Sequence, residues 1–204
     1  TRSIFPEADD AVLTYLDDDG TIVEPEYYVP IIPFALLNGI SGIGTGFSCS
    51  IPSYNPKTII HYLKSKLTNK DVSAIEFVPY YEGFAGSIRE IADHKYLIKG
   101  MYEKIADDKV RITELPIGTW TMAYTSYLET LVDGAINAKT GKKSHPLIKD
   151  FTSVSTEVAV NFVIIFNRGQ LAELELIVDD NNCNGVEKLL KLFTTVSTTN
   201  MHLF

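Results

Sequence analysis

Cysteine is scarce in this sequence: Cys49 and Cys183 are the only two among 204 residues, and neither belongs to a CxxC pair. Two thiolates are too few for a four-cysteine zinc site, and the four histidines show no HxH or HExxH spacing that would complete one. The positions of the four histidines also give no sign of a catalytic triad. We therefore expect no metal site and no catalytic residue in this chain. We expect both thiols to be reduced, as in an intracellular protein.

Long apolar runs are also missing, since no stretch of eighteen apolar residues occurs. We therefore expect no membrane-spanning helix and no membrane partner. The first residues lack the basic start and apolar stretch of a signal peptide, and the absence of an initiator methionine favours a piece of a longer protein. The composition, 45% hydrophobic and 11% aromatic, is sufficient for one sizeable core or two small ones.

Acidic residues are absent from one long window, although the chain as a whole carries a net charge of −8. Residues 1–26 hold eight acids against Arg2 alone, so they account for seven of the eight net negative charges. Residues 27–70 contain no Asp or Glu, and their charged residues are Lys57, Lys64, Lys66 and Lys70. A polyanion held at short range responds to the local field more than to the total charge. The acidic composition therefore does not exclude a nucleic-acid partner.

A glycine-rich segment, "LLNGISGIGTGFSCSIP", lies inside this acid-free window, with Ile43 between its closely spaced glycines. It lacks the Lys-Ser/Thr of a Walker A loop and the spacing of G-x-G-x-x-G, so a nucleotide cradle is disfavoured. One interpretation is a glycine-rich turn with Ile43 packed inward. The other is a rigid apolar point on backbone that can approach a partner closely, because isoleucine is stiff and glycine lacks a side chain. Those are the requirements for a wedge between stacked base pairs.

Turn and cap signals indicate the elements of the first half of the chain. Residues 10–16 suggest a short helix, followed by a turn at "DDDGT" that lacks the acids of an EF-hand loop. Three prolines between residues 25 and 33 indicate extended chain. Asn55 followed by Pro56 predicts the start of a helix with one apolar face and a lysine-rich end.

Alternating and helical patterns follow in the second half. Residues 84–115 alternate between apolar and polar residues, which predicts one antiparallel meander. "TMAYTSYLETLVDGAI" predicts a helix capped by Thr119 or Thr121, with Trp120 as a core or hinge anchor. After a basic loop, "EVAVNFVIIF" predicts a strand, and "GQLAELELIV" and "NGVEKLLKLF" predict two further helices. We therefore expect an α+β layer that begins near residue 48.

Three separated segments carry a resemblance to a known family: "VEPEYYVPIIPFALLNGISGIGTGFSCSIPSYNP", "ITELPIGTWT" and "TTNMHLF". They closely resemble the DNA breakage-reunion region of eukaryotic-type (type IIA) type II DNA topoisomerases, and "FPEADDAVLTYL" is similar to the segment shortly after that family's catalytic tyrosine. The resemblance covers essentially the whole chain. It implies that residues 1–47 are the C-terminal part of the winged-helix domain, including the DNA-wedge turn. It also implies that residues 48–204 are most of the tower, an α/β domain with an antiparallel sheet and flanking helices.

The same resemblance implies the DNA-binding residues. In that family the isoleucine of the G-I-G-T-G turn inserts between base pairs of the gate DNA and bends it, and that position is Ile43 here. The residues expected to shape the wedge or to contact phosphates are Asn38, Gly42, Gly44, Thr45, Lys57, Lys64, Lys142 and Lys143. Two departures from the family pattern stand out. Ile40 and Ser41 replace Ala-Glu, which removes an acid near the duplex, and Gly118 replaces a basic residue, so no basic contact is expected there.

For the full-length enzyme, the resemblance implies ATP-dependent breakage, passage and rejoining of double-stranded DNA, assisted by Mg²⁺, in a homodimer formed through other parts of the chain. The family's nucleophilic tyrosine follows an arginine, and none of the four arginines here precedes a tyrosine. We therefore expect that this polypeptide alone does not cut DNA and binds neither Mg²⁺ nor ATP. The expected location is the nucleus, or a cytoplasmic replication site if the source is a virus. The alternatives are a non-enzymatic DNA-bending or protein-interaction module, and a small phosphate-binding enzyme.

Overall fold

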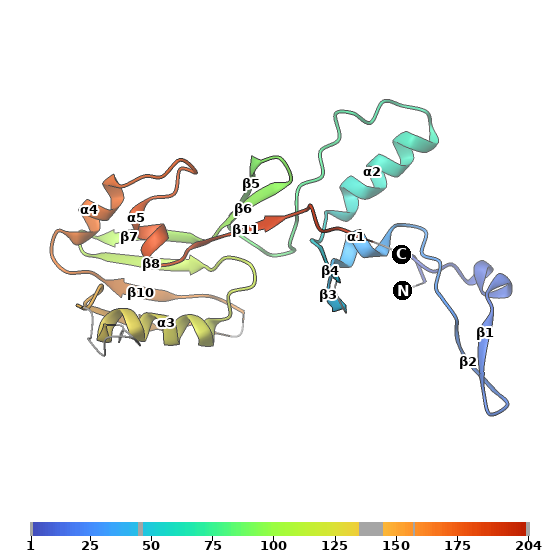
Figure 1. The fold of residues 1–204 in the computed structure, drawn as a ribbon, viewed down its shortest axis with the longest axis horizontal. Helices are drawn as coiled ribbons and strands as arrows, with labels where there is room; N and C mark the ends of the chain where they lie inside the picture. The colour runs from blue at the N-terminus through green and yellow to red at the C-terminus, as the bar shows by residue number, and fades with distance from the viewer. Residues whose placement is uncertain (1, 45–46, 135–144, 157, 203–204) are drawn as a thin grey trace. The chain divides into compact units, whose positions relative to one another are not determined.

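The chain folds into two compact units in a computed structural model, and each unit is described by itself (Figure 1). The structure describes residues 2–44, 47–134, 145–156 and 158–202. The first unit comprises Thr1–Tyr81 and Thr198–Phe204, and the second comprises Glu82–Ser197. Every named strand pair is antiparallel, which confirms the α+β class. The expected boundary near residue 48 lies at the start of a strand in the first unit, and the assignment of a winged-helix tail and a tower stays a prediction.

The first unit consists, within the described residues, of two hairpins and three helical segments. In chain order these are η1 (Glu7–Val12), β1 (Tyr15–Asp18), β2 (Thr21–Pro25), α1 (Phe34–Asn38), β3 (Ile40–Gly44), β4 (Phe47–Ile51) and α2 (Pro56–Leu67). The expected turn between β1 and β2 is confirmed: Asp19 and Gly20 have φ angles of 52° and 85°. The expected helix over residues 10–16 is wrong in its extent. The 3₁₀ turn ends at Val12, and antiparallel pairing with β2 holds the chain extended from Tyr15 onward.

Helix α2 begins where the sequence predicts. The Asn55 side chain accepts a hydrogen bond from the backbone N–H of Lys57 at 2.9 Å, and Pro56 occupies the first turn. This is the cap geometry that satisfies a free N–H at a helix start. The helix buries Ile59, which is only 1% exposed, and leaves Leu67 at its end 84% exposed.

The second unit contains, in its described part, two antiparallel sheets and three helices. In chain order the elements are β5 (Ser87–Ala92), β6 (Lys95–Lys99), β7 (Met101–Ala106), β8 (Lys109–Glu114), α3 (Thr121–Asp133), β9 (Asp150–Ser153), β10 (Phe162–Ile165), α4 (Gln170–Leu176), α5 (Gly185–Leu189) and β11 (Phe193–Ser197). The strand orders are β7-β8-β10-β9 and β11-β6-β5. The predicted strand in "EVAVNFVIIF" and the two predicted helices after it are confirmed as β10, α4 and α5.

The expected single meander over residues 84–115 is wrong, because the chain changes sheets at Gly100. Strand β6 pairs with β5 and β11, whereas β7 pairs with β8. At the change, the Gly100 N–H donates to the carbonyl of Leu192 at 2.8 Å. A Cβ on Gly100 would overlap the carbonyl oxygen of Glu114, so the backbones approach more closely there than any side chain allows. Apolar residues occur on both sides of this point, at residues 96–98 and 101–102, so the sequence pattern gives no sign of the change.

The core of the second unit joins α3 to the four-stranded sheet. Phe162 and Ile164 of β10 pair with Ile112 and Val110 of β8, and all four side chains are fully buried. The ring of Tyr124 packs edge-on against Phe162 at 5.2 Å. The Tyr124 hydroxyl donates to the buried carbonyl of Leu190 at 2.7 Å, and burial raises the pKa of this phenol well above its usual range. The hydroxyl therefore stays a neutral donor.

The start of helix α3 differs from the sequence prediction. Trp120, rather than Thr119 or Thr121, is the N-cap residue, and no side-chain cap hydrogen bond is formed there. The Trp120 side chain is 80% exposed, so the expectation of a core anchor is wrong. The residue has extended backbone geometry at the point where the helix begins, and the core of this unit is built by the helix residues that follow.

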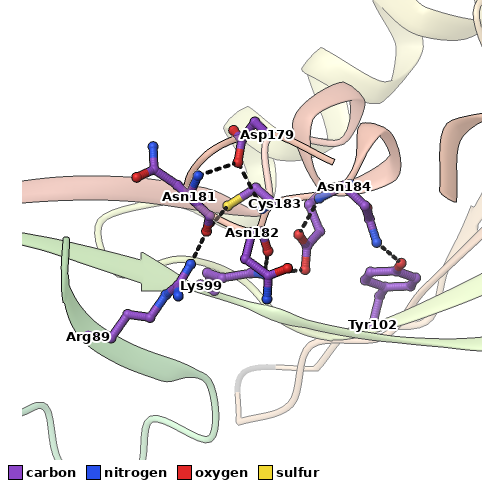
Figure 2. Close-up of polar contacts among 9 residues, drawn as sticks. Arg89, Lys99, Tyr102, Asp179, Asn181, Asn182, Cys183 and Asn184 are labelled. Atoms are coloured by element: carbon purple, nitrogen blue, oxygen red, sulfur yellow. Dashed lines mark hydrogen bonds and ion pairs between the residues drawn. The ribbon is translucent and has the colours of Figure 1, made fainter. Parts of the chain in front are cut away.

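A polar cluster connects β5 and β6 to the loop before α5 (Figure 2). Arg89 donates to the carbonyl of Asn181, and Lys99 donates to the carbonyl of Asn182 at 3.1 Å. Lys99 also forms an ion pair with Glu187 at 2.7 Å, and both side chains are less than one-fifth exposed. Two cations thus satisfy loop carbonyls that the strands and helices leave unpaired.

Asn184 closes this cluster, and its replacement by alanine is expected to reduce the free energy of unfolding by roughly 2 kcal/mol. Its side chain accepts from the Glu187 N–H at 2.9 Å in a reciprocal capping box and donates to the Tyr102 hydroxyl at 2.7 Å. Denaturant unfolding measures the change. Asn181→Ala is the matched control, because Asn181 uses only its backbone in the hydrogen bonds of the described chain. An equal loss in both variants would contradict the assignment.

Candidate nucleic-acid interface

Ile43 lies near the end of β3 and points away from the protein. In the hairpin β3–β4 it stands opposite Ser48, and Gly42 stands opposite Cys49. Its side chain is 93% exposed. The interpretation in which Ile43 packs inward is therefore wrong. An isoleucine exposed to this degree gains nothing from the fold, so its apolar surface is available to a partner.

The glycines around Ile43 have two different roles. A Cβ on Gly42 would have no heavy atom within 4 Å, so this backbone is open for close approach by a partner. Gly39 has a φ of 70°, and a Cβ there would lie 2.9 Å from the carbonyl oxygen of Ile51. Gly39 therefore fixes the tight passage from α1 into β3. Asn38 ends α1, and its carbonyl accepts from the Ser53 hydroxyl at 3.2 Å, which ties this passage to the chain after β4.

The C-terminal segment supports the opposite strand of the hairpin. The Ser50 N–H donates to the carbonyl of Asn200 at 2.8 Å, and the Asn200 side chain donates to the Ser48 hydroxyl at 2.7 Å. The Cys49 thiol donates to the carbonyl of His202 at 3.0 Å. Reasoning on sequence spacing missed these residues. Their only signal was the "TTNMHLF" motif, for which the resemblance gave no role.

The predicted DNA-binding residues fall into three groups: those in or next to the hairpin, those on α2, and those outside the described part of the chain. Asn38, Gly42 and Ile43 lie in or next to the hairpin, and Gly44 pairs with Phe47 in its last register position. Lys57 and Lys64 lie on α2, which begins a few residues after β4. The predicted residues that lie outside the described part of the chain are Thr45, Lys142 and Lys143.

Both predicted lysines of α2 are exposed. Lys57 lies in the first turn and Lys64 in the last, where a positive charge suits the helix dipole. Among the described residues neither forms an ion pair. Their ammonium groups are therefore free to contact an anion such as a phosphate.

The described residues do not themselves supply a metal site or a disulfide. Among the described residues, no group of three or more His, Cys, Asp or Glu side chains could hold a metal ion. Cys49 and Cys183 are both free. No helix in the described ranges is long and apolar enough to cross a membrane.

The fold matches a known class of proteins, the type II DNA topoisomerases. The model of the DNA gyrase/topoisomerase IV A-subunit family matches residues 1–204. The chain therefore belongs to this family.

Two similar relatives are eukaryotic enzymes. The chain is 40% identical over 205 residues to DNA topoisomerase 2 of Pisum sativum and 41% identical over 204 residues to DNA topoisomerase 2 of Plasmodium falciparum. Each alignment covers 100% of this chain and 13% of the relative. A crystal structure of the DNA-binding, cleavage and re-ligation domain of Plasmodium falciparum topoisomerase II superposes with a TM-score of 0.84 at 40% identity. That alignment covers 100% of this chain and 26% of the other.

Proposed function

We propose that this chain is the part of a type II DNA topoisomerase that binds and bends the duplex to be cut. The observation that carries the proposal is the 93% exposure of Ile43 at a glycine-flanked position of β3. A stiff apolar side chain on open backbone can enter a base step, unstack it and kink the duplex, at a cost of a few kcal/mol per step. The two hydrogen bonds between Asn200 and β4, one accepted by its carbonyl and one donated by its side chain, support this mechanism, since a wedge must not yield when it is pushed.

Phosphate contacts would hold the duplex while the wedge acts. Lys57 and Lys64 supply cations within a window of the sequence that has no carboxylate, and Lys142 and Lys143 are proposed to add to them. Such contacts set position and register without reading bases. Sequence preference would then come from how easily a given step deforms, which favours flexible pyrimidine–purine steps.

The chemistry of strand cleavage belongs, in this proposal, to the rest of the enzyme. The full-length homodimer would supply the nucleophilic tyrosine, the Mg²⁺ ligands and the ATPase. It would act in the nucleus, or at a cytoplasmic replication site in a viral host cell. The 204-residue chain itself is expected to leave supercoiled plasmid uncut in the presence of Mg²⁺ and ATP. Linear or nicked product above a no-protein control would contradict this division.

Energy transfer between dyes at the two ends of a duplex of about 30 base pairs tests the proposal, since bending brings the ends together. The chain is titrated into the labelled duplex, and binding is followed in parallel by anisotropy. The proposal expects energy transfer to rise with the bound fraction, and to rise more when a TA or CA step lies at the centre. Binding with unchanged energy transfer would reject the wedge and leave a simple phosphate-binding surface.

Lys64→Ala is expected to weaken DNA binding without changing the bend. Removing one phosphate contact should reduce the slope of log Kd against log salt by about one. Anisotropy titrations at several salt concentrations measure this slope. Lys95→Ala, an exposed lysine of the second unit, is the control for loss of charge alone. The same slope change in both variants would show a diffuse charge effect rather than a contact at Lys64.

A further inference from the structure

A separate apolar cavity of about 310 Å³ lies in the first unit, away from the exposed tip of the hairpin. Four segments form its walls: α1, α2, the chain around Phe77 and the C-terminal segment. Its lining residues are Pro33, Leu36, Tyr54, Ile59, Tyr62, Leu63, Phe77 and Met201. The volume lies at the lower end of the range of small-molecule sites.

The chemistry of the lining selects the kind of ligand. None of the lining residues is charged. Phe77 packs edge-on against Tyr54 at 5.8 Å and against Tyr62 at 5.3 Å, so aromatic rings form a continuous wall. The Tyr54 hydroxyl lies 3.6 Å from the Met201 sulfur. An anionic ligand would lose its hydration here without gaining a partner, and for a cationic one the Lys66 ammonium already lies over the Tyr62 ring. A flat uncharged ring would gain ring–ring and sulfur–ring contacts.

Two of the segments that line the cavity, α1 and the C-terminal segment, also connect to the β3–β4 hairpin or contact it. Leu36 belongs to α1, which leads through Gly39 into β3. The Leu36 carbonyl accepts a hydrogen bond from the Tyr54 N–H at 2.8 Å. Met201 follows Asn200, which bonds to β4. A ligand in contact with Leu36 and Met201 would therefore hold the C-terminal segment against the hairpin.

We propose that this cavity binds a flat, uncharged aromatic small molecule, and that such a ligand tightens the contact between the C-terminal segment and β4. The site differs from the DNA-binding surface, and the proposal does not depend on DNA bending. Because Met201 is one wall, the ligand binds well only while residues 198–202 are seated. Binding and seating are thus linked by mass action.

Titration of 5-fluoroindole, followed by ¹⁹F NMR, tests the binding in the 204-residue chain. Saturable binding is expected, and Leu63→Phe should abolish it because the added ring occupies the cavity. Leu67→Phe is the matched control, since it makes the same change one turn further along α2 at a residue that is 84% exposed and outside the cavity. Phe77→Leu gives a second variant that removes an aromatic wall and should weaken binding. Absence of saturation in the parent chain, or equal binding by the parent and Leu63→Phe, overturns the proposal.

The reactivity of Cys49 tests the tightening. Its thiol is partly exposed and donates to the carbonyl of His202, so a seated C-terminal segment shields it and slows its alkylation. At ten times its Kd the ligand should slow iodoacetamide modification of Cys49 by up to about tenfold, measured by mass spectrometry. Buried Cys183 in the second unit serves as the internal reference. A Cys49 rate that stays constant at saturation overturns the linkage, whatever the outcome of any DNA experiment.

Discussion

Ile43→Ala is expected to abolish most of the duplex bend while leaving the chain folded. The side chain contributes little to stability because it is 93% exposed, so its truncation should change the free energy of unfolding by less than about 0.5 kcal/mol. Its loss removes the group that occupies the opened base step. Energy transfer between duplex ends should therefore fall close to the value of free DNA at saturating protein.

A matched control for this variant lies in the same strand. Ile40→Ala removes the same atoms, but side chains alternate along a strand, so Ile40 and Ile43 project from opposite faces of the hairpin. Ile40→Ala should keep the bend. The Ile43→Ala variant should keep most of its affinity for DNA although it loses most of the induced bend, because phosphate contacts supply most of the affinity. A bend that survives in Ile43→Ala, or is lost equally in both variants, would refute the wedge.

Gly100→Ala is expected to destabilise the second unit strongly for so small a substitution. A methyl group there would overlap the backbone carbonyl of Glu114, and backbone cannot rotate away as a flexible side chain can. Overpacking of this kind costs about 1–3 kcal/mol and occasionally more, and here it also pulls apart the point where the two sheets meet. Differential scanning calorimetry should show a lower Tm for this unit.

Gly42→Ala is the control for the glycine effect, because a Cβ at Gly42 would have no heavy atom within 4 Å. Its stability should match that of the parent chain. If Gly100→Ala unfolds at the same denaturant concentration as Gly42→Ala, the close approach to Glu114 is not a constraint on the fold. Gly42→Ala should nevertheless weaken DNA bending, because the added methyl keeps the duplex away from β3.

Local signals in the sequence predicted the elements that depend on neighbours in the chain. Asn55 and Pro56 fixed the start of α2, and the turn after β1 followed from its Asp-Gly pair. The pairing partners were a different matter. At Gly100 the apolar residues continue from one sheet into the next, and only the close approach of Glu114 and Leu192 marks the change of sheet. That proximity is a tertiary property, which spacing along the chain does not encode.

The candidate site could be predicted in part, for a similar reason. The glycine spacing and the missing carboxylates drew attention to Ile43, but they left open whether it pointed inward or outward. The support of β4 could not be foreseen. Asn200 lies 152 residues from Ser48 along the chain, and neither of the two motifs that contain them indicates that they pair. Trp120 was predicted to be a core or hinge anchor because it is a large aromatic residue, and its 80% exposure rules out the core alternative.

The separation between β4 and its supporting segment has a consequence for how the protein acquires its shape. Residues 47–51 leave the ribosome long before residue 200 is made, so the β3–β4 hairpin first exists without the bonds to Asn200. Closing a loop of this length is entropically slow compared with forming local turns. The intervening unit, Glu82–Ser197, shortens that search once it has folded, because the loop then closes across a compact body rather than a random coil. The hydrogen bonds between Asn200 and β4 are therefore expected to form late in folding, and slow folding of the second unit would delay them.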